Sequence, residues 1–346
     1  MKYTIKDCCN MAKGYIIYYS NPMLRKAKGI NLALNMWKFG EKNPDKIIYY
    51  ITDISSGGSG IFSLYLDIIE ELSYAKAMGW IPVVDDTDQL LRRTKVCFRK
   101  NQNIMNQYFD FSNQITVEEV KKSKNVIISS IPTKRAYRNM PHNTSYLLYK
   151  NKSFFECNDE EIQYWRNFVK SNFQYKKRIQ DILDITYRRV INNRRKVIGV
   201  AIREGKLGMT KRGEKKSGEQ DQPALEKMLK RTKECLDKWK YEYIYLSCEC
   251  DKTIEVFRDY FGENKIIYLE RIRLEFDYLK SIRSMKEGVK KANQNPLIIQ
   301  NYSLIDLQYI QDMYILSKCE SCILPVNCGT EAAFIQSRGY ENILVV

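Results

Sequence analysis

The sequence contains almost no histidine: His142 is the only one among 346 residues. A Ser-His-Asp or Cys-His catalytic arrangement would have to use this one residue, and metal sites built from several histidines are excluded. His142 lies in the loop-like segment Met-Pro-His-Asn, where we expect an ordinary loop residue. Any general base of this chain is therefore expected to be Asp, Glu or Lys.

Long hydrophobic runs and an export signal are also missing. No apolar run approaches the roughly 20 residues that cross a bilayer. The first nine residues lack the basic and then apolar pattern of a secretory signal peptide. Ten cysteines without such a signal predict reduced thiols in a cytoplasmic protein.

Acidic residues are fewer than basic ones, 41 against 57, which gives a formal net charge of +16. This excess favours anionic partners such as nucleotides, nucleic acid or the anionic surface of a membrane. Lys, Asn, Ile and Tyr are all abundant, and a general compositional bias of this kind also produces a basic chain. The charge therefore restricts the class of partner without choosing one.

Short apolar runs alternate with helical patterns along the chain, which predicts an α/β fold with parallel sheets. Residues 1–45 carry little signal beyond helical and loop-like stretches. In the first half we expect a helix at 61–78 and strands at 46–54, 80–84 and 125–130. In the second half we expect helices at 224–240, 251–261, 305–318 and 329–338, and strands at 197–203, 243–247, 265–269, 322–326 and 343–346.

The length of the chain suggests two domains. Residues 158–195 are polar, helical in pattern and free of tight turn signals. We therefore predict connecting helices at 158–195, between an N-terminal domain of residues 1–157 and a C-terminal domain of residues 196–346. Two α/β halves joined in this way would leave a cleft between them that could hold two substrates.

A glycine-rich loop separates the first predicted strand from its helix. Backbone N–H groups and the helix N-terminus can approach an anion there, because the loop contains Gly57, Gly58 and Gly60. Asp85 or Asp86, after the next strand, could hold a ribose, as in dinucleotide and S-adenosylmethionine sites. The spacing is not G-x-G-x-x-G, and a tight turn without a ligand explains the glycines equally well.

A basic loop follows the strand predicted at 197–203. Arg203 stands where the strand ends, Lys206 comes three residues later, and two cations near one strand end suit a diphosphate. Glu204 lies beside Arg203. Carboxylates in the same loop could take a proton from a hydroxyl nucleophile, and the candidates by charge are Glu214, Glu219 and Asp221. A solvated charged loop without a ligand is the alternative.

Polar residues also precede the helix predicted at 329–338. Asn327, Cys328, Gly329 and Thr330 would present side-chain donors and helix N–H groups to a phosphate, and Asp312 lies on the preceding helix. Helix capping by Asn327 or Thr330 alone explains the same pattern.

Two cysteine pairs have spacings seen in zinc sites. They are Cys319 with Cys322 and Cys248 with Cys250. A redox pair is disfavoured, because Cys319 lies at a predicted helix C-terminus, where the helix dipole opposes a thiolate. Cysteine also behaves as a small buried apolar residue, which is the reading we favour.

Taken together, these motifs resemble the fucosyltransferase superfamily, which includes the core α1,6-, nodulation-type, α1,2- and protein O-fucosyltransferases. The likeness covers most of the chain in short motifs. They are Gly60-Ile-Phe-Ser with Ala75-Lys-Ala-Met-Gly-Trp-Ile-Pro-Val-Val-Asp85, Val-Ala-Ile-Arg203 with Lys206-Leu-Gly208 and Pro223, Tyr243-Ile-Tyr-Leu-Ser-Cys-Glu249-Cys-Asp, and Ile310-Gln-Asp312 with Asn327-Cys-Gly-Thr330. The chain departs from the family at Ala201, where a histidine is usual, at Asn327-Cys328 and at Gln222.

The resemblance implies a GT-B glycosyltransferase: two Rossmann-like domains, the first on the acceptor side and the second binding the nucleotide sugar. It implies inverting transfer, without a metal or other cofactor, of a sugar such as fucose from GDP-fucose. Arg203 would bind the β-phosphate with help from Lys206. The resemblance assigns no base by match, and among the loop carboxylates that are candidates by charge we take Glu219 as the base. Donor binding would further involve Glu249, Asp312 and the four residues Asn327, Cys328, Gly329 and Thr330.

The expected acceptor is a glycan or lipid-linked glycan in surface polysaccharide biosynthesis. The protein is expected in the cytoplasm, where its charge would favour contact with an anionic membrane face. We expect no nucleic-acid partner, because no such motif is recognised. Two alternatives stay open: an S-adenosylmethionine-dependent methyltransferase using the glycine loop and Asp85, and a non-catalytic basic protein whose nucleic-acid binding falls steeply with salt.

Overall fold

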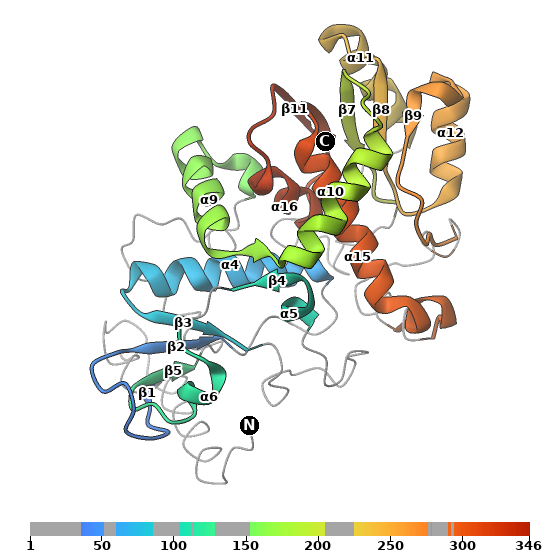
Figure 1. Cartoon of the computed structure of the whole chain (residues 1–346). Coiled ribbons are helices and arrows are strands. Elements are labelled where there is room, and N and C mark those ends of the chain that lie inside the picture. Colours follow the sequence, from blue (N-terminus) through green and yellow to red (C-terminus); the bar gives the residue numbers. More distant parts are fainter. Residues whose placement is uncertain are drawn as a thin grey trace, which may run out of the picture. The chain divides into compact units, whose positions relative to one another are not determined.

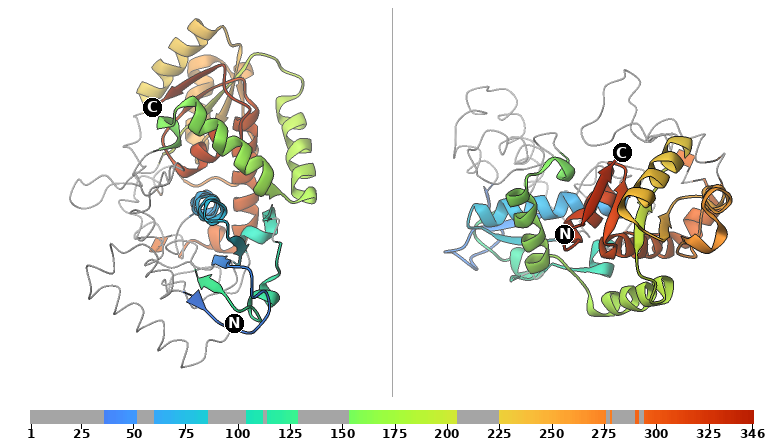
Figure 2. Two further views of the ribbon diagram at one scale, coloured as in Figure 1. Left: turned by 90° about the vertical axis from the view of Figure 1, so that its left-hand side faces the viewer. Right: turned by 90° about the horizontal axis from the view of Figure 1, so that it is seen from above.

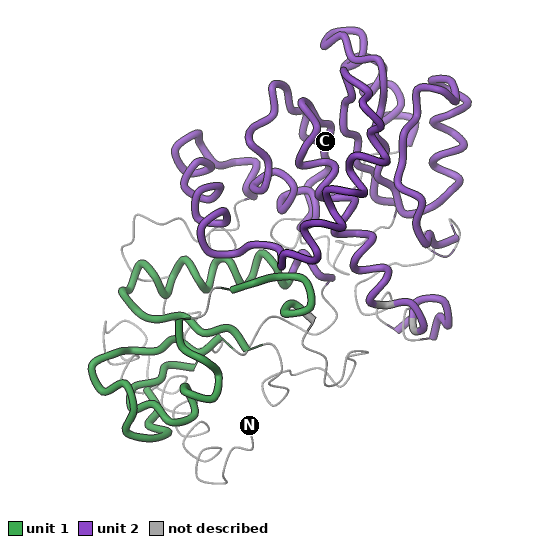
Figure 3. Tube along the Cα trace, in the orientation of Figure 1, with its two compact units in different colours: residues 1–59, 64–95, 99–150 green, residues 60–63, 96–98, 151–346 purple. Residues whose placement is uncertain are grey.

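The structure is a computed structural model and describes residues 36–51, 60–85, 104–111, 114–128, 153–204, 225–275, 278, 290–291 and 294–346. The chain divides into two units (Figure 3). The first contains residues 1–59, 64–95 and 99–150, and the second contains residues 60–63, 96–98 and 151–346. Both are described below, each by itself.

The first unit contains a four-stranded sheet with the order β1-β5-β2-β3 (Figure 1). Strand β2 runs parallel to β3 and β5, and β1 pairs antiparallel with β5 at the edge. The strands are β1 (Met36–Trp37), β2 (Ile48–Ile51), β3 (Ile81–Val84) and β5 (Val126–Ile128). Helix α4 (Ile61–Ala77) connects β2 to β3 in sequence, and shorter elements are α5 (Ile104–Tyr108), β4 (Phe109–Asp110) and α6 (Val117–Val120).

An aromatic cluster fills one side of this sheet. The rings of Tyr49, Tyr74 and Trp80 lie with their centroids 5.5–5.8 Å apart, and all three side chains are buried. The hydroxyl of Tyr49 donates to Oε2 of Glu71 at 2.5 Å, so the polar end of the buried ring is hydrogen-bonded. The neighbouring strand residue Tyr50 is fully buried from the other side.

The second unit contains a five-stranded parallel sheet with the order β11-β10-β7-β8-β9. From β7 the chain moves to β8 and β9 on one side, and then returns to β10 and β11 on the other. This reversal is the topology of a Rossmann-like half, and it places a switch point between β7 and β10. The strands are β7 (Val197–Ala201), β8 (Tyr243–Ser247), β9 (Ile266–Ile267), β10 (Ser321–Leu324) and β11 (Asn342–Val345).

Helices cover both faces of this sheet (Figure 1, Figure 2). Helices α11 (Leu225–Trp239) and α12 (Asp251–Phe261) lie on one face, while α15 (Pro296–Lys318) packs on the other and contacts α10 (Lys177–Ile191). Helix α16 (Cys328–Gln336) follows β10 and packs against α9 (Asp159–Asn172) and α15. The short 3₁₀ helices are η1 (Phe154–Glu156) and η2 (Glu263–Lys265).

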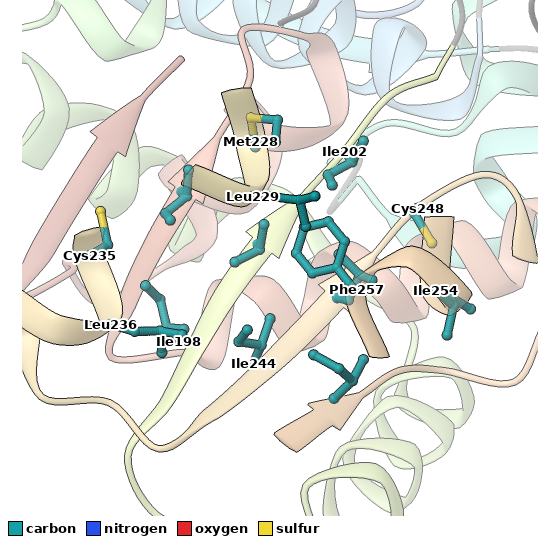
Figure 4. Close-up of a cluster of buried hydrophobic side chains, with 14 residues drawn as sticks. Ile198, Ile202, Met228, Leu229, Cys235, Leu236, Ile244, Cys248, Ile254 and Phe257 are labelled. Carbon is teal, nitrogen blue, oxygen red and sulfur yellow. The ribbon is translucent and has the colours of Figure 1, made fainter. Parts of the chain in front are cut away.

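The sheet side chains alternate between these two layers. Ile198 and Val200 of β7 point into an apolar cluster with Met228 of α11 and Phe257 of α12 (Figure 4). Gly199 between them faces the other layer, where an added Cβ would lie 2.9 Å from a methyl carbon of Leu316. The period of two along β7 therefore sets which helix each residue meets.

The α/β class with two parallel-rich sheets confirms the fold expected from the sequence. The strand predicted at 243–247 and the helix predicted at 251–261 have those bounds. Helix α15 begins at Pro296, with Asn295 as its N-cap, rather than at 305. A non-helical residue, Asn301 (φ −121°), interrupts it, which explains why its first turns were not recognised.

The stretch 158–195, where connecting helices are expected, contains α9 and α10, and a two-residue strand that was not expected, β6 (Gln174–Tyr175), separates them. Phe173 and Tyr175 alternate with exposed Gln174, which is the pattern of extended backbone. The stretch 1–45 is not only helical and loop-like, since β1 forms an edge strand at Met36–Trp37.

No helix among the described residues has the length and apolarity needed to cross a bilayer.

Candidate active site

The switch point of the second sheet lies between the ends of β7 and β10. In open α/β sheets the loops that leave such a point diverge and leave a crevice for a ligand at the carboxyl ends of the strands. Arg203 and Glu204 follow β7 after one intervening residue, Ile202, and Asn327 follows β10 and caps the N-terminus of α16. Two of the three motifs predicted from the sequence therefore come together at this edge.

The side chain of Glu204 connects the end of β7 with the end of β8. Its carboxylate accepts hydrogen bonds from the backbone N–H of Glu249 at 2.9 Å and of Cys250 at 3.3 Å, at the start of α12. Burial, and next the charge of Glu249, raise the pKa of Glu204 above its ordinary value. Glu204 thus fixes the β8–α12 turn against the end of β7.

Asp312 is buried within a charged cluster. Its Oδ1 accepts from the hydroxyl of Tyr245 at 2.5 Å, and its Oδ2 lies 2.8 Å from Nε of Arg271. Arg271 also donates from Nη2 to the carbonyl oxygen of Cys248 at 2.6 Å. The side chains of Asp312 and Arg271 are 1% and 7% exposed. Asp312 was predicted to hold the nucleoside, and in the structure its carboxylate holds two protein groups.

The segment after β9 contains two arginines, Arg271 and Arg273, whose position the sequence pattern did not indicate. Arg273 donates to the carbonyl oxygen of Leu269 at 2.6 Å and lies over the ring of Tyr268 at 5.3 Å. The backbone N–H of Leu274 donates to the carbonyl oxygen of Glu249 at 3.0 Å. This segment has no clear period in the sequence, so only tertiary contacts bring it to the edge of the sheet.

The backbone N–H groups at the N-terminus of α16 donate hydrogen bonds to the side chain of the helix's own N-cap residue. Oδ1 of Asn327 accepts from the N–H groups of Gly329 at 3.0 Å and of Thr330 at 3.1 Å. The hydroxyl of Thr330 donates to the carbonyl oxygen of Pro325 at 2.5 Å. The capping alternative is therefore present in the structure, and Asn327 and Thr330 are both buried. The side chain of Cys328 is partly exposed.

The glycine loop is described only at its end. Gly60 precedes α4, and an added Cβ there would meet nothing within 4 Å. The hydroxyl of Tyr50 donates to Oδ2 of Asp85, which is 5% exposed. Gly57, Gly58, Asp86, Lys206 and Glu219 lie outside the described residues, as do Glu214, Asp221 and His142.

The cysteine pairs lie inside the second unit. Cys319 ends α15 and Cys322 lies in β10, and both are buried. Their sulfur atoms face Gly199, where an added Cβ would lie 2.7 Å from Sγ of Cys322 and 3.1 Å from Sγ of Cys319. Burial raises the pKa of the Cys322 thiol well above its ordinary value. Among the described residues no group of three or more His, Cys, Asp or Glu could hold a metal ion.

The fold class is thus an α/β protein with two parallel-rich sheets. No protein-family model and no curated protein sequence matches the chain. The NodZ α-1,6-fucosyltransferase structure soaked with GDP-fucose is 14% identical, covering 84% of this chain and 93% of that one, with a TM-score of 0.43. Fucosyltransferase NodZ from Bradyrhizobium is 14% identical, with coverages of 84% and 94% and a TM-score of 0.41. POFUT1 in complex with GDP is 11% identical, with coverages of 88% and 98% and a TM-score of 0.40.

Proposed function

We propose that this chain is a metal-independent, inverting glycosyltransferase of GT-B architecture that takes its sugar from GDP-fucose. The observation that carries the proposal is the position of Arg203, two residues after the last residue of the central strand β7 and at the switch point of a Rossmann-like sheet. The family motifs quoted from the sequence support the same reading, since Arg203 is their strand-end arginine.

Arg203 would bind the β-phosphate of the donor. A guanidinium presents a rigid fork of N–H groups that matches phosphate oxygens, and it keeps its charge at any working pH. As the glycosidic bond breaks, negative charge grows on the leaving diphosphate and its attraction to Arg203 increases. Removing one donor of this kind costs about 2.7–4 kcal/mol in the barrier.

The other site residues would support this arginine. The first turn of α16, from Cys328 to Thr330, would place the positive end of a helix dipole near the phosphates. Asp312 would act on the nucleoside side of the site through Arg271, whose guanidinium it holds. Lys206 remains a predicted second phosphate contact, Glu219 a predicted base and Glu249 a predicted donor contact.

For the acceptor we propose a glycan or lipid-linked glycan used in surface polysaccharide biosynthesis. The formal charge of +16 supports a cytoplasmic enzyme that works next to an anionic membrane face. This acceptor class also fits a chain whose first domain would bind sugars rather than a second nucleotide.

The first test is a thermal-shift panel with GDP, UDP, CDP and S-adenosylmethionine on the full chain. We expect GDP to stabilise the protein, and Arg203→Ala to remove that shift. Arg195→Ala is the matched control, because Arg195 is exposed at the opposite end of β7. In GDP-fucose turnover we expect Arg203→Ala to lose roughly 100- to 1,000-fold, the rate equivalent of one lost donor.

Each other result points elsewhere. Stabilisation by UDP or CDP alone would keep a nucleotide-sugar enzyme but discard GDP-fucose. Stabilisation by S-adenosylmethionine alone would favour a methyltransferase. Full turnover by Arg203→Ala would contradict the role given to Arg203.

A further inference from the structure

The hydroxyl of Tyr309 lies against the first turn of α16. An added Cβ on Gly329 would lie 2.1 Å from Oη of Tyr309 and 3.1 Å from Sδ of Met313, one turn further along α15. Real side chains do not approach so closely, so residue 329 has to be glycine while Tyr309 stays where it is. The α15–α16 contact is therefore built around this hydroxyl.

The ring of Tyr309 is fixed from a second direction. It meets the ring of Phe62 edge to face, with the centroids 5.2 Å apart and the planes at 82°. Phe62 lies in the first turn of α4, within residues 60–63, which group with the second unit. Edge-to-face contacts of this kind hold both rings in a defined orientation. Tyr309 thus connects the start of α4, after the glycine loop, with the start of α16.

Residues of the candidate site act electrostatically on the same hydroxyl. Arg203, Glu249, Cys328 and Arg271 all act electrostatically on Tyr309. Burial raises the pKa of Tyr309 above its ordinary value, and the hydroxyl therefore keeps its proton at neutral pH. The hydrogen bonds of the described residues leave this hydroxyl without a protein partner. It is a protonated donor against the first turn of α16, and the charge of the arginine that is proposed to bind phosphate acts on it.

We propose that the Tyr309 hydroxyl donates a hydrogen bond to the diphosphate of the bound nucleotide sugar, beside Arg203. This inference rests on the proposed function and deepens it, because it assigns a neutral donor to the same phosphate site. With the N–H groups of Gly329 and Thr330 occupied by Asn327, the phenol supplies a contact that the helix terminus itself lacks.

Tyr309→Phe tests this directly, because it removes only the hydroxyl and keeps the ring on Phe62. We would measure binding of GDP and of guanosine to the full chain by calorimetry. Hydrogen bonds to a charged group are worth about 1.5–3 kcal/mol, so we expect GDP binding to weaken about ten-fold or more. Guanosine binding should be unchanged, because it has no phosphate.

Tyr314→Phe is the matched control, one and a half turns further along α15. Its hydroxyl donates to Oδ1 of Asp184 on α10 at 2.5 Å, away from the sheet edge. This control should lower the melting temperature but leave GDP binding as in the wild type. Gly329→Ala is a second variant: its methyl group would displace the hydroxyl, so GDP but not guanosine should bind more weakly.

Three results would overturn the inference. If Tyr309→Phe binds GDP within two-fold of the wild type, the hydroxyl does not contact phosphate. If it loses GDP and guanosine equally, together with melting temperature, the residue is only structural. If the wild type binds none of GDP, UDP and CDP, the proposed function fails and this inference fails with it. The first two leave the proposed function intact, so the two failures can be distinguished.

Discussion

Strand β2 of the first unit and strand β7 of the second are both buried over their whole length, but their side chains differ in size. Strand β2 carries Tyr49 and Tyr50, whose rings fill the layers on both sides. Strand β7 carries Gly199, and its layer is filled instead by Leu316 of α15 and the thiols of Cys319 and Cys322. The layer beside a buried strand can therefore be filled by large side chains of the strand itself or by side chains of the neighbouring elements.

Each unit has a polar anchor, by which we mean a buried carboxylate that accepts a hydrogen bond from a strand tyrosine. In the first, Tyr50 donates to the buried carboxylate of Asp85. In the second, Tyr245 donates to the buried carboxylate of Asp312, which also pairs with Arg271. The added guanidinium brings a buried positive charge to the edge where a nucleotide is proposed to bind. This difference makes the second unit more sensitive to the loss of its carboxylate.

The largest effect is expected from Asp312→Ala. It leaves the buried guanidinium of Arg271 without its counter-ion, which costs about 3–5 kcal/mol in the free energy of unfolding. Asp85→Ala removes a hydrogen-bond acceptor from Tyr50 and should cost only about 1–3 kcal/mol. Urea denaturation of the full chain measures both. Equal losses would show that Arg271 does not distinguish the two anchors.

A smaller effect is expected from Gly199→Ala. The added methyl group meets Sγ of Cys322 and the side chain of Leu316, and overpacking of this kind costs about 1–3 kcal/mol. Cys322→Ala removes the nearest atom, so the double variant should recover part of the loss, and denaturation of all four proteins forms a cycle. Purely additive losses would mean that Gly199 and Cys322 do not compete for the same space.

The smallest effect concerns the pH dependence of stability at Glu204. Its pKa is raised in the folded state by burial and by Glu249. Its contribution is therefore fully present below the ordinary carboxyl pKa of about 4.3 and is lost as the pH rises through the raised value. Glu204→Gln cannot ionise, so the unfolding free energy should fall less between pH 4 and pH 7 than in the wild type. If urea denaturation shows that the unfolding free energy changes equally with pH in both proteins, this assignment is contradicted.

Much of the fold could be predicted from local pattern. Apolar runs and helical spacing placed β8 and α12 correctly, because β8 is a short apolar run buried almost throughout and the buried residues of α12 recur at helical spacing. The break at 173–176 was missed, since two alternating aromatic residues are too short a signal against a helical background. For the candidate site, the position of Arg203 at a strand end could be predicted, because Arg203 comes after an apolar run in the sequence.

The sequence by itself determined an α/β chain with strand-end polar residues after β7 and β10, because each of these features is encoded within a few neighbouring residues. Only the tertiary structure decided which groups meet. It brought Arg271 to Asp312, set Glu204 on the N–H groups of the β8–α12 turn, and placed the hydroxyl of Tyr309 on Gly329. The physical reason is that these partners are 20 to 46 residues apart. Their encounter depends on how the helices pack on the sheet, and no local period records it.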